Sequence, residues 1–231
     1  MVATFTPEDL QTLGKGLEGR SPQEAIAWAL ETFNPDIALA CSFGAEDVAL
    51  VDMAVKIRPD VQIFYLDTEL LFPETYEVRD RLIEKYNIQP VRYRPFLSVE
   101  DQAKVYGDEL WTQNPDLCCG MRKVQPLTQA LKPLKAWITG IRRDQAPTRA
   151  NAGIVEWDGK FNLVKVNPLA PWTWDQVWSY ISENQVPYCA LHDQGYPSIG
   201  CAPCTRRVAA GEDPRAGRWS GFQKTECGLH Q

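Results

Sequence analysis

Histidine and methionine are scarce in this sequence, and no apolar run has the length that crosses a membrane. Of the 231 residues, two are histidine and three are methionine. No stretch approaches the roughly 18 consecutive apolar residues of a spanning helix. The start, MVATFTPEDLQTLGKG, lacks the basic, apolar and small-residue succession of a secretory signal peptide. We therefore expect no membrane association and a cytoplasmic location.

A Gly-Lys-Ser/Thr phosphate-binding signature is also missing, so γ-phosphate transfer by the P-loop route is not expected. The segment SFGAED, residues 42–47, stands where a predicted strand meets its helix. Free backbone N–H groups and the helix dipole can hold an anion at such a position. The signal is weak by itself, because Glu46 and Asp47 can complement the dipole themselves.

Cysteine, in contrast, is frequent and clustered. In a reducing cytosol, seven thiols in clusters indicate metal, cluster or redox chemistry more than a disulfide framework. Cys118 and Cys119 are adjacent in LCCGMRK, and Cys201 and Cys204 form a CxxC in GCAPCTRR. Neighbouring side chains diverge, which suits one zinc ion poorly, whereas a 4Fe-4S cubane offers each thiolate a separate iron. The spacing favours the cubane, with zinc, a redox dithiol and coincidence as alternatives.

The other three cysteines stand alone. Cys41 and Cys189 have apolar or aromatic neighbours, so we expect buried, inert thiols. Cys227 lies in the polar tail KTECGLHQ, residues 224–231, where little core can bury it. A thiol in such a tail is expected to serve through its reactivity.

The net charge of −6 argues against nucleic-acid binding, but the charge is unevenly distributed. From residue 118 to residue 149 only Asp144 opposes seven basic residues, namely Arg122, Lys123, Lys132, Lys135, Arg142, Arg143 and Arg149. From residue 205 to the end, five basic residues oppose three acids. Because both basic stretches also hold the unusual cysteines, we favour a small anionic ligand over a solvated basic face. Two plainer interpretations are kept: His192 as a loop histidine with satisfied hydrogen bonds, and Arg142 or Arg143 as the partner of Asp144.

Strand and helix patterns alternate along most of the chain. Strands are expected at 36–43, 61–68, 91–96, 136–140 and 162–169, and helices at 21–33, 44–56, 72–86 and 173–184. Thr173 with Gln176 has the spacing of a capping box. The alternation predicts an α/β fold with a mostly parallel sheet flanked by helices on both faces, and ligands at the carboxyl ends of the strands.

Glycine and proline become frequent from residue 187 to residue 228, which predicts loop and short helix across the sheet edge. We expect one domain over residues 1–231. It consists of an N-terminal helical segment (1–35), an α/β core (36–200) and a C-terminal segment with the tail (201–231).

Seven motifs, in one order between about Asp36 and His230, resemble the adenylyl-sulfate (APS) and phosphoadenylyl-sulfate (PAPS) reductase family. They are SFGAED, LDTELLFPET, LCCGMRKVQPL, ITGIRRDQAPTR, LHDQGYPSIGCAPCTRR, RAGRW and KTECGLH. The resemblance implies an adenine-nucleotide α-hydrolase-like fold of the PP-loop or HUP type. Because all four paired cysteines are present, the chain is most similar to the cluster-bearing branch that uses APS. Some members of that branch accept both substrates, so action on PAPS or on both stays open.

The resemblance also implies thiol-dependent reduction of APS to sulfite and AMP in assimilatory sulfate reduction. Cys227 would be the catalytic thiol, passing through an S-sulfocysteine that thioredoxin or glutaredoxin resolves. One 4Fe-4S cluster would be held by Cys118, Cys119, Cys201 and Cys204. The implied nucleotide contacts are Ser42, Gly44, Asp47, Leu66, Asp67 and Thr68, and the implied phosphosulfate contacts are Lys123, Arg149, Arg215, Arg218 and His230.

Several points are left open. The family commonly has Ser directly before Gly-Ala-Glu-Asp, where this chain has Phe43, so the hydroxyl contact of Ser42 is uncertain. Asp67 and Thr68 also fit a simple turn. An ATP-dependent PP-loop adenylating or thiolation enzyme and a zinc-binding interaction module are the rival functions, and a homo-oligomer is compatible with the sequence.

Overall fold

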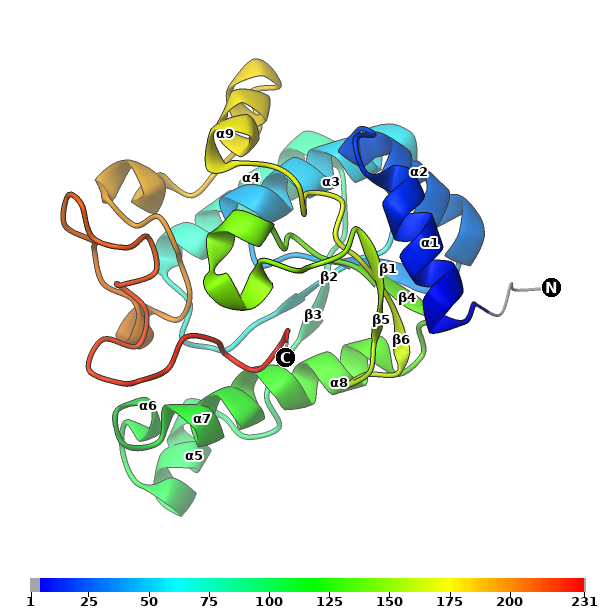
Figure 1. Cartoon of the computed structure of the whole chain (residues 1–231). Coiled ribbons are helices and arrows are strands. Elements are labelled where there is room, and N and C mark those ends of the chain that lie inside the picture. The colour runs from blue at the N-terminus through cyan, green and yellow to red at the C-terminus, as the bar shows by residue number, and fades with distance from the viewer. Residues whose placement is uncertain (1–4, 231) are drawn as a thin grey trace.

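A twisted six-stranded sheet forms the centre of the computed structural model, which describes residues 5–230 (Figure 1). The strand order is β3-β2-β1-β4-β6-β5. The strands are β1 Ile37–Ala40, β2 Ile63–Leu66, β3 Val91–Tyr93, β4 Ala136–Ile138, β5 Val155–Asp158 and β6 Leu163–Val166. All neighbours are parallel except β5, which runs antiparallel to β6. The predicted mostly parallel sheet is confirmed. The first four residues of the expected N-terminal segment and Gln231 of the tail lie outside the described residues.

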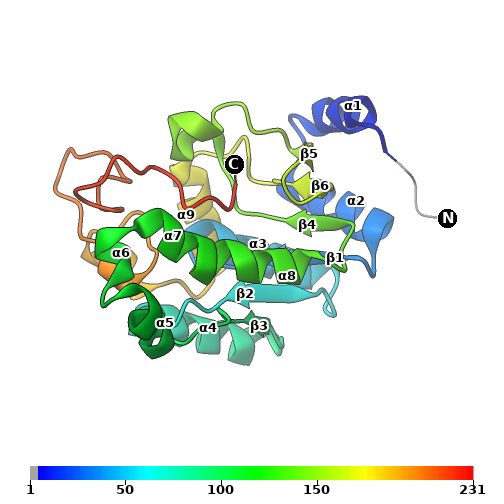
Figure 2. The same ribbon diagram turned by 90° about the horizontal axis from the view of Figure 1, so that it is seen from below.

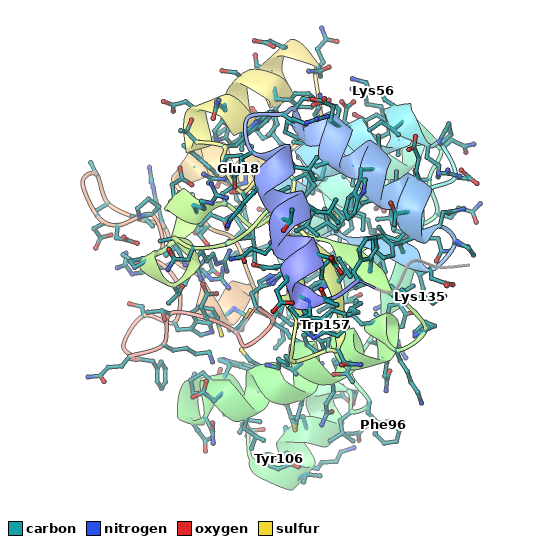
Figure 3. All side chains as sticks on the ribbon, turned by 45° about the vertical axis from the view of Figure 1, so that its right-hand side comes forward. Glu18, Lys56, Phe96, Tyr106, Lys135 and Trp157 are labelled. Atoms are coloured by element: carbon teal, nitrogen blue, oxygen red, sulfur yellow. The ribbon has the colours of Figure 1, made fainter. Side chains whose placement is uncertain are left out.

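Helices cover both faces of the sheet (Figures 1 and 2). One face carries α2 Pro22–Phe33, α3 Ala45–Ile57, α4 Pro73–Tyr86 and α9 Trp174–Glu183. The other carries α5 Val99–Tyr106, α6 Leu110–Gln113, α7 Pro115–Cys119, the π-helical turn η1 Gly120–Val124 and α8 Gln125–Leu131. Helix α1, Pro7–Leu17, packs against β5. Phe96 and Tyr106 lie on the outer surface of the α5–α8 layer (Figure 3).

The sheet has a hydrophobic core on each face, and the alternating side chains of its strands contribute to both. Ile37 and Leu39 of β1 belong to the larger core under α2 and α3, whereas Ala38 between them joins a second core. That second core packs Phe64 and Trp137 against Leu127 and its neighbours on α8. Successive side chains point to opposite faces of a strand, so a strand covered on both faces reads as a continuous apolar run.

Each of the four predicted helices coincides with a helix of the structure. The capping box at the start of α9 is confirmed, since the Thr173 hydroxyl accepts from the Gln176 N–H and the Gln176 side chain accepts from the Thr173 N–H. Helices α1 and α2 both lie in the expected N-terminal helical segment, whereas strand β5 and the short helices α5 to α8 were not predicted. None of the helices in residues 5–230 has the length and apolar character needed to cross a bilayer.

The C-terminal segment covers the carboxyl ends of the strands (orange to red in Figure 1). In the described residues beyond Cys189, regular structure is limited to the 3₁₀ turns η4 Ala190–Gln194 and η5 Ala202–Cys204 and isolated bridges. The expectation of loop and short helix is confirmed. Two further 3₁₀ turns, η2 Arg143–Gln145 and η3 Pro147–Arg149, follow β4 and face the same end of the sheet.

Asp52 fastens three helices together and provides a test of this packing. Its carboxylate, on α3 and 1% exposed, accepts hydrogen bonds from Tyr86 Oη at 2.8 Å and Tyr180 Oη at 2.5 Å, and pairs with Lys56 Nζ at 2.7 Å. Asp52→Ala leaves both hydroxyls without their acceptor. We expect the free energy of unfolding to fall by about 2–4 kcal/mol, measured by urea denaturation.

The matched control is Asp80→Ala on α4, whose carboxylate is exposed and pairs with Arg79. That change is expected to stay within about 0.5 kcal/mol of the unmodified protein. Equal stability losses in the two variants would contradict a specific role for Asp52.

Candidate functional site

A cavity of about 380 Å³ lies at the carboxyl ends of β1, β2 and β4, under the C-terminal tail. It is the point at which an open α/β sheet presents ligand-binding loops. Every sequence-derived catalytic and substrate-contact residue except Asp67 lines it, namely Ser42, Gly44, Asp47, Leu66, Thr68, Lys123, Arg149, Arg215, Arg218, Cys227 and His230. The structure thus gathers residues spread over most of the chain into one cavity.

The loop after β1 turns through a left-handed residue, Phe43, at φ 64°. The Phe43 ring packs edge-on against Tyr65, with 5.3 Å between centroids. The N–H and the hydroxyl of Ser42 both donate to Asp47 Oδ2 at 2.6 Å. Burial raises the pKa of Asp47 to about 6, although Ser42 acts in the other direction. Gly140 is required beside this loop, because a Cβ there would stand 2.2 Å from Asp47 Oδ1.

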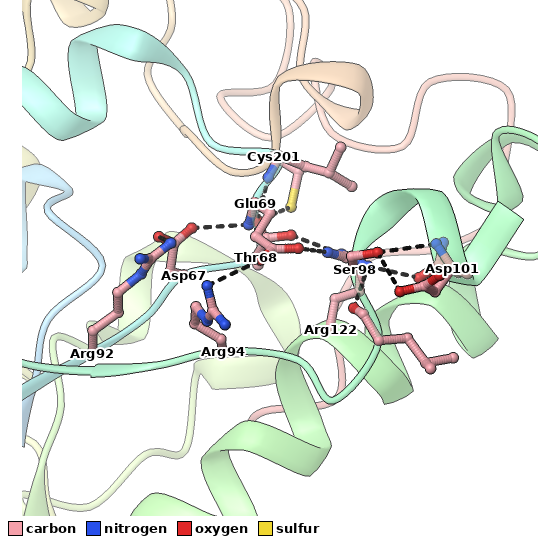
Figure 4. A network of polar contacts seen from close by, with 12 residues as sticks. Asp67, Thr68, Glu69, Arg92, Arg94, Ser98, Asp101, Arg122 and Cys201 are labelled. Atoms are coloured by element: carbon pink, nitrogen blue, oxygen red, sulfur yellow. Dashed lines mark hydrogen bonds and ion pairs between the residues drawn. The ribbon is translucent and has the colours of Figure 1, made fainter.

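Asp67 stabilises the loop after β2 through hydrogen bonds and does not line the cavity. Its Oδ1 accepts from Tyr76 Oη at 2.6 Å. The same oxygen accepts from the Glu69 N–H at 2.8 Å, and Oδ2 pairs with Arg92 at 2.5 Å (Figure 4). Thr68 does reach the cavity, and its hydroxyl lies 3.3 Å from Cys201 Sγ. The turn interpretation fits Asp67, whereas Thr68 adjoins both the cavity and the cysteines.

The four paired cysteines line a second, smaller cavity next to the first. Cys118 and Cys119 end α7, and the Cys201 loop is held to the end of β2 by the hydrogen bond from the Ala202 N–H to the Leu70 carbonyl at 2.7 Å. Among residues 5–230, no three or more His, Cys, Asp and Glu side chains converge to hold a single metal ion. Lys123 lines both cavities.

Arg122 ties the Cys118–Cys119 helix to the end of β2 (Figure 4). Although its side chain is 1% exposed, it donates to the Thr68 carbonyl at 2.7 Å and pairs with Glu69 Oε2 at 2.8 Å. It also donates to Gln102 Oε1 at 3.0 Å. Its neighbour Lys123 faces the cavities instead, so the π-helical turn η1 sends adjacent basic residues to different places.

The tail enters the large cavity with Cys227 half-buried in it. Burial acts to raise the pKa of the Cys227 thiol, but Lys123, the Leu229 N–H and Arg218 outweigh it, so the pKa lies below its ordinary value. Three residues on, His230 stacks on Trp137 with 5.6 Å between centroids and 14° between planes. Burial and nearby cations hold the pKa of His230 well below its usual range, so its ring is neutral near pH 7.

Much of the expected basic patch is paired with acids. Arg142 pairs with Glu46 at 2.8 Å and with Asp144, as one of the plainer interpretations predicted. Arg143 pairs instead with Glu18 at the end of α1. Arg218 has no carboxylate partner among the described residues; it donates to Ser198 Oγ at 3.2 Å and lies over the Trp219 ring at 4.5 Å. Lys123 likewise has no ion-pair partner in the described part of the chain.

Three further residues matter at this site. Glu226, 4% exposed, pairs with Arg149 at 2.7 Å, a contact that no local sequence pattern indicates. Gln145 accepts from Arg149 at 2.6 Å and donates to Glu46 at 2.9 Å, so it fixes both. The prediction of a satisfied His192 is wrong: this residue lies on the cavity wall, and neither of its buried ring nitrogens has a hydrogen-bond partner among residues 5–230.

Cys41 and Cys189 are buried, as predicted for inert thiols. Burial raises the pKa of both, that of Cys41 well above its usual value. Neither thiol is therefore ionised near neutral pH.

Arg122→Met tests the tie between the Cys118–Cys119 helix and the loop after β2. Removal of the guanidinium leaves the Thr68 carbonyl and Glu69 without a buried partner, so the free energy of unfolding should fall by about 3–5 kcal/mol in urea denaturation. The control Arg94→Met removes an exposed guanidinium 3.8 Å from the same Glu69, and a loss below about 0.5 kcal/mol is expected. Similar losses would show that burial of Arg122 has no special weight.

Asp47→Asn tests the raised pKa. A carboxyl group whose pKa is higher in the folded chain binds more protons when the chain is folded. The contribution of Asp47 to the free energy of unfolding therefore falls as the pH rises from about 4 to about 6, and it is constant above pH 6. Asparagine does not titrate. Relative to the unmodified protein, the variant should therefore gain about 1–3 kcal/mol across that window in urea denaturation. Parallel pH profiles would refute the shift.

Comparisons with known proteins agree with this geometry. The family model of the phosphoadenosine phosphosulfate reductase domain matches residues 36–207. The phosphoadenosine 5'-phosphosulfate reductase of Gloeobacter violaceus is 49% identical over 96% of this chain and 93% of that protein. The adenosine 5'-phosphosulfate reductase of Halalkalibacterium halodurans is 47% identical over 96% and 97%.

Among solved structures, the phosphate complex of the phosphoadenylyl-sulfate reductase from Candida auris superimposes with a TM-score of 0.79 at 35% identity. It covers 90% of this chain and 100% of that one. The expected nucleotide-hydrolase-like α/β fold is confirmed by this match. The chain belongs to the phosphoadenosine phosphosulfate reductase domain family.

Proposed function

We propose that this protein is an oxidoreductase that reduces adenylyl sulfate to sulfite and AMP in sulfate assimilation. The observation that carries the proposal is the position of Cys227: a half-buried thiol in the cavity at the carboxyl ends of the strands, in the field of Lys123 and Arg218. Relatives from several bacteria at 45–50% identity are named adenosine 5'-phosphosulfate reductases. The name of the Gloeobacter relative makes action on PAPS the second candidate.

The first step is attack on sulfur. The Cys227 thiolate bonds to the sulfur of the sulfate group, and the bond from that sulfur to the bridging oxygen breaks. AMP leaves with the electron pair, and the thiol carries the sulfonate as S-sulfocysteine. An anionic nucleophile approaching an anionic substrate is opposed electrostatically, so catalysis depends on cations placed around both.

Lys123 and Arg218 suit this task because neither has an acidic partner, among the described residues, that would neutralise it. Both also favour the thiolate of Cys227, and the pKa of Lys123 is itself raised: burial opposes its charge, but the Cys201 and Cys227 thiols outweigh burial. His230 is neutral in this state and contributes as a hydrogen-bond donor. Arg149 and Arg215 complete the cationic wall.

The second step needs an external dithiol, for which we propose thioredoxin or glutaredoxin. Its thiolate attacks the Cys227 sulfur, sulfite leaves with the bonding electrons, and the second thiol of the partner then releases Cys227 as a thiolate. The dithiol becomes a disulfide, which supplies the two electrons. Such an exchange requires Cys227 to leave the cavity, and a reducing cytoplasm fits a chain with seven unpaired thiols.

A 4Fe-4S cluster on Cys118, Cys119, Cys201 and Cys204 belongs to the proposal. Four thiols that share one cavity without converging on a single point suit a group with several metal atoms better than one zinc ion. Without a bound group these thiols would stay protonated near neutral pH. Burial and neighbouring thiols raise the pKa of Cys118 to about 11, and burial, above all, raises the pKa of Cys204 to about 12. When bound, such a group would brace the two segments and supply charge beside Lys123.

The experiment is anaerobic incubation of the protein with sulfur-labelled APS without reductant, followed by denaturation and peptide mapping. We expect label on Cys227, none after Cys227→Ser, and release as sulfite when thioredoxin is added. Cys189→Ser is the matched control, because that thiol is buried away from the cavity lining, and full labelling is expected. Undiminished labelling of Cys227→Ser would refute the mechanism.

Two rival functions predict other results. An ATP-dependent adenylating or thiolation enzyme would release pyrophosphate from ATP, and a zinc-binding interaction module would contain zinc without iron or sulfide after anaerobic purification. Metal analysis and a pyrophosphate assay on the same preparation separate them from the proposed reductase.

A further inference from the structure

We propose that Glu226 is a built-in anion that occupies the sulfate-binding arginines until substrate displaces it. The inference rests on the proposed function, because it takes the cavity as the site for adenylyl sulfate. It concerns the residue next to the catalytic thiol, for which that mechanism provides no role.

The first support is the geometry of the Glu226 carboxylate. It accepts from Arg149 Nε at 2.8 Å and Nη2 at 2.7 Å, a two-pronged pairing of guanidinium and carboxylate. Thr148 Oγ1 donates to it at 3.1 Å and Arg215 Nη2 at 3.3 Å. A sulfate or phosphate group would use the same donors, so the carboxylate stands where an anionic substrate group would bind.

The second support is burial. Glu226 is 4% exposed, within the same cavity wall as Cys227, although the residues on its N-terminal side from Gly221 to Gln223 are exposed. Burial acts to raise the pKa of Glu226, but Arg149 and Arg215 outweigh it and keep the pKa low, so the group is ionised at neutral pH. A buried carboxylate is tolerated because the two guanidinium groups replace its lost hydration.

The third support is charge balance. Without Glu226, Arg149 would retain only the neutral Gln145 as a partner and Arg215 only the Thr225 carbonyl, among the described residues. Two guanidinium groups close together, on side chains only 12% and 17% exposed, would repel each other, and burial and the nearby arginines act to lower the pKa of Arg215. The Glu226 carboxylate therefore offsets one of these two positive charges and holds the two arginines together between turnovers.

The consequence is an exchange of anions. When the phosphosulfate arrives, it takes over the donors of Arg149 and Arg215, and Glu226 loses the contact that anchors this part of the tail. Cys227, the next residue, is then no longer held by the Glu226 anchor when its substrate is in place. Substrate affinity is reduced by the competition, which is the measurable cost of the arrangement.

The test measures APS binding by calorimetry in the full chain carrying Cys227→Ser, purified anaerobically, so that no turnover occurs. Glu226→Gln in this background keeps the shape and removes the charge, and we expect Kd for APS to fall about tenfold. Glu226→Asp keeps the charge on a shorter stem and should give a gain of about threefold. Glu212→Gln removes an exposed carboxylate of the same segment that pairs with Arg206, and should change Kd by less than twofold.

A second measurement separates competition from a merely structural anchor. Without nucleotide, Cys227 in Glu226→Gln protein should be alkylated by iodoacetamide several-fold faster than in the unmodified chain. Faster alkylation with unchanged APS affinity would reduce Glu226 to an anchor and overturn the proposal, as would weaker APS binding. If Glu226→Gln does not fold, the absence of any gain in Glu226→Asp overturns it equally.

The same titrations distinguish this inference from the proposed function. Failure of the Cys227→Ser parent to bind APS would remove the proposed function, and the inference with it. Binding by the parent with no gain in the Glu226 variants would remove the inference alone.

Discussion

Repulsion between like charges is the constraint on which this site depends. In the proposed reaction a thiolate and a sulfated nucleotide meet in a half-buried cavity, where water screens charge poorly. The fold meets the constraint by bringing cations from separate segments to one end of the sheet. Lys123 comes from the turn after α7, Arg149 from η3, and Arg215 and Arg218 from the segment that crosses the strand ends. Without a sheet to order these segments, their charges would be dispersed.

The same constraint explains why acids and bases are sorted within the cavity wall. Glu46 neutralises Arg142 and is held by Gln145, which in turn orients Arg149. Arg142 is thus paired with acids, whereas Lys123 and Arg218 have no acidic partner among the described residues and, in the proposed reaction, keep their charge for the reacting groups. A simple count of basic residues along the sequence does not separate these two kinds, because the partner of each is set by the fold.

Much of the fold and the membership of the site could be predicted from the sequence. Apolar strands such as 36–43 and helices with clear caps such as 173–184 can be predicted from their local sequence alone. The short helices between β3 and β4 and the strand Val155–Asp158 do not, since β5 exists only by pairing with β6, as in the Glu156–Lys165 contact. The motifs also predicted most of the residues that line the cavity. Asp67 is an exception: the sequence does not distinguish it from a ligand-binding carboxylate, but in the structure it contacts Arg92 and Tyr76. The role of Glu226 could not be predicted from the sequence, because its partner Arg149 lies 77 residues away.

The π-helical turn Gly120–Val124 has a consequence for the length of the chain at this point. Each residue added to or removed from a helix rotates the rest of that helix by about 100°. A one-residue deletion here would rotate the apolar face of α8, which includes Leu127 and Leu131, away from the sheet. If α8 kept its place, the deletion would instead rotate Cys118 and Cys119 away from the cavity that they share with Cys201 and Cys204. The wide turn thus sets the rotation of α8 relative to α7, and a change in residue number within this segment would displace one of the two helices.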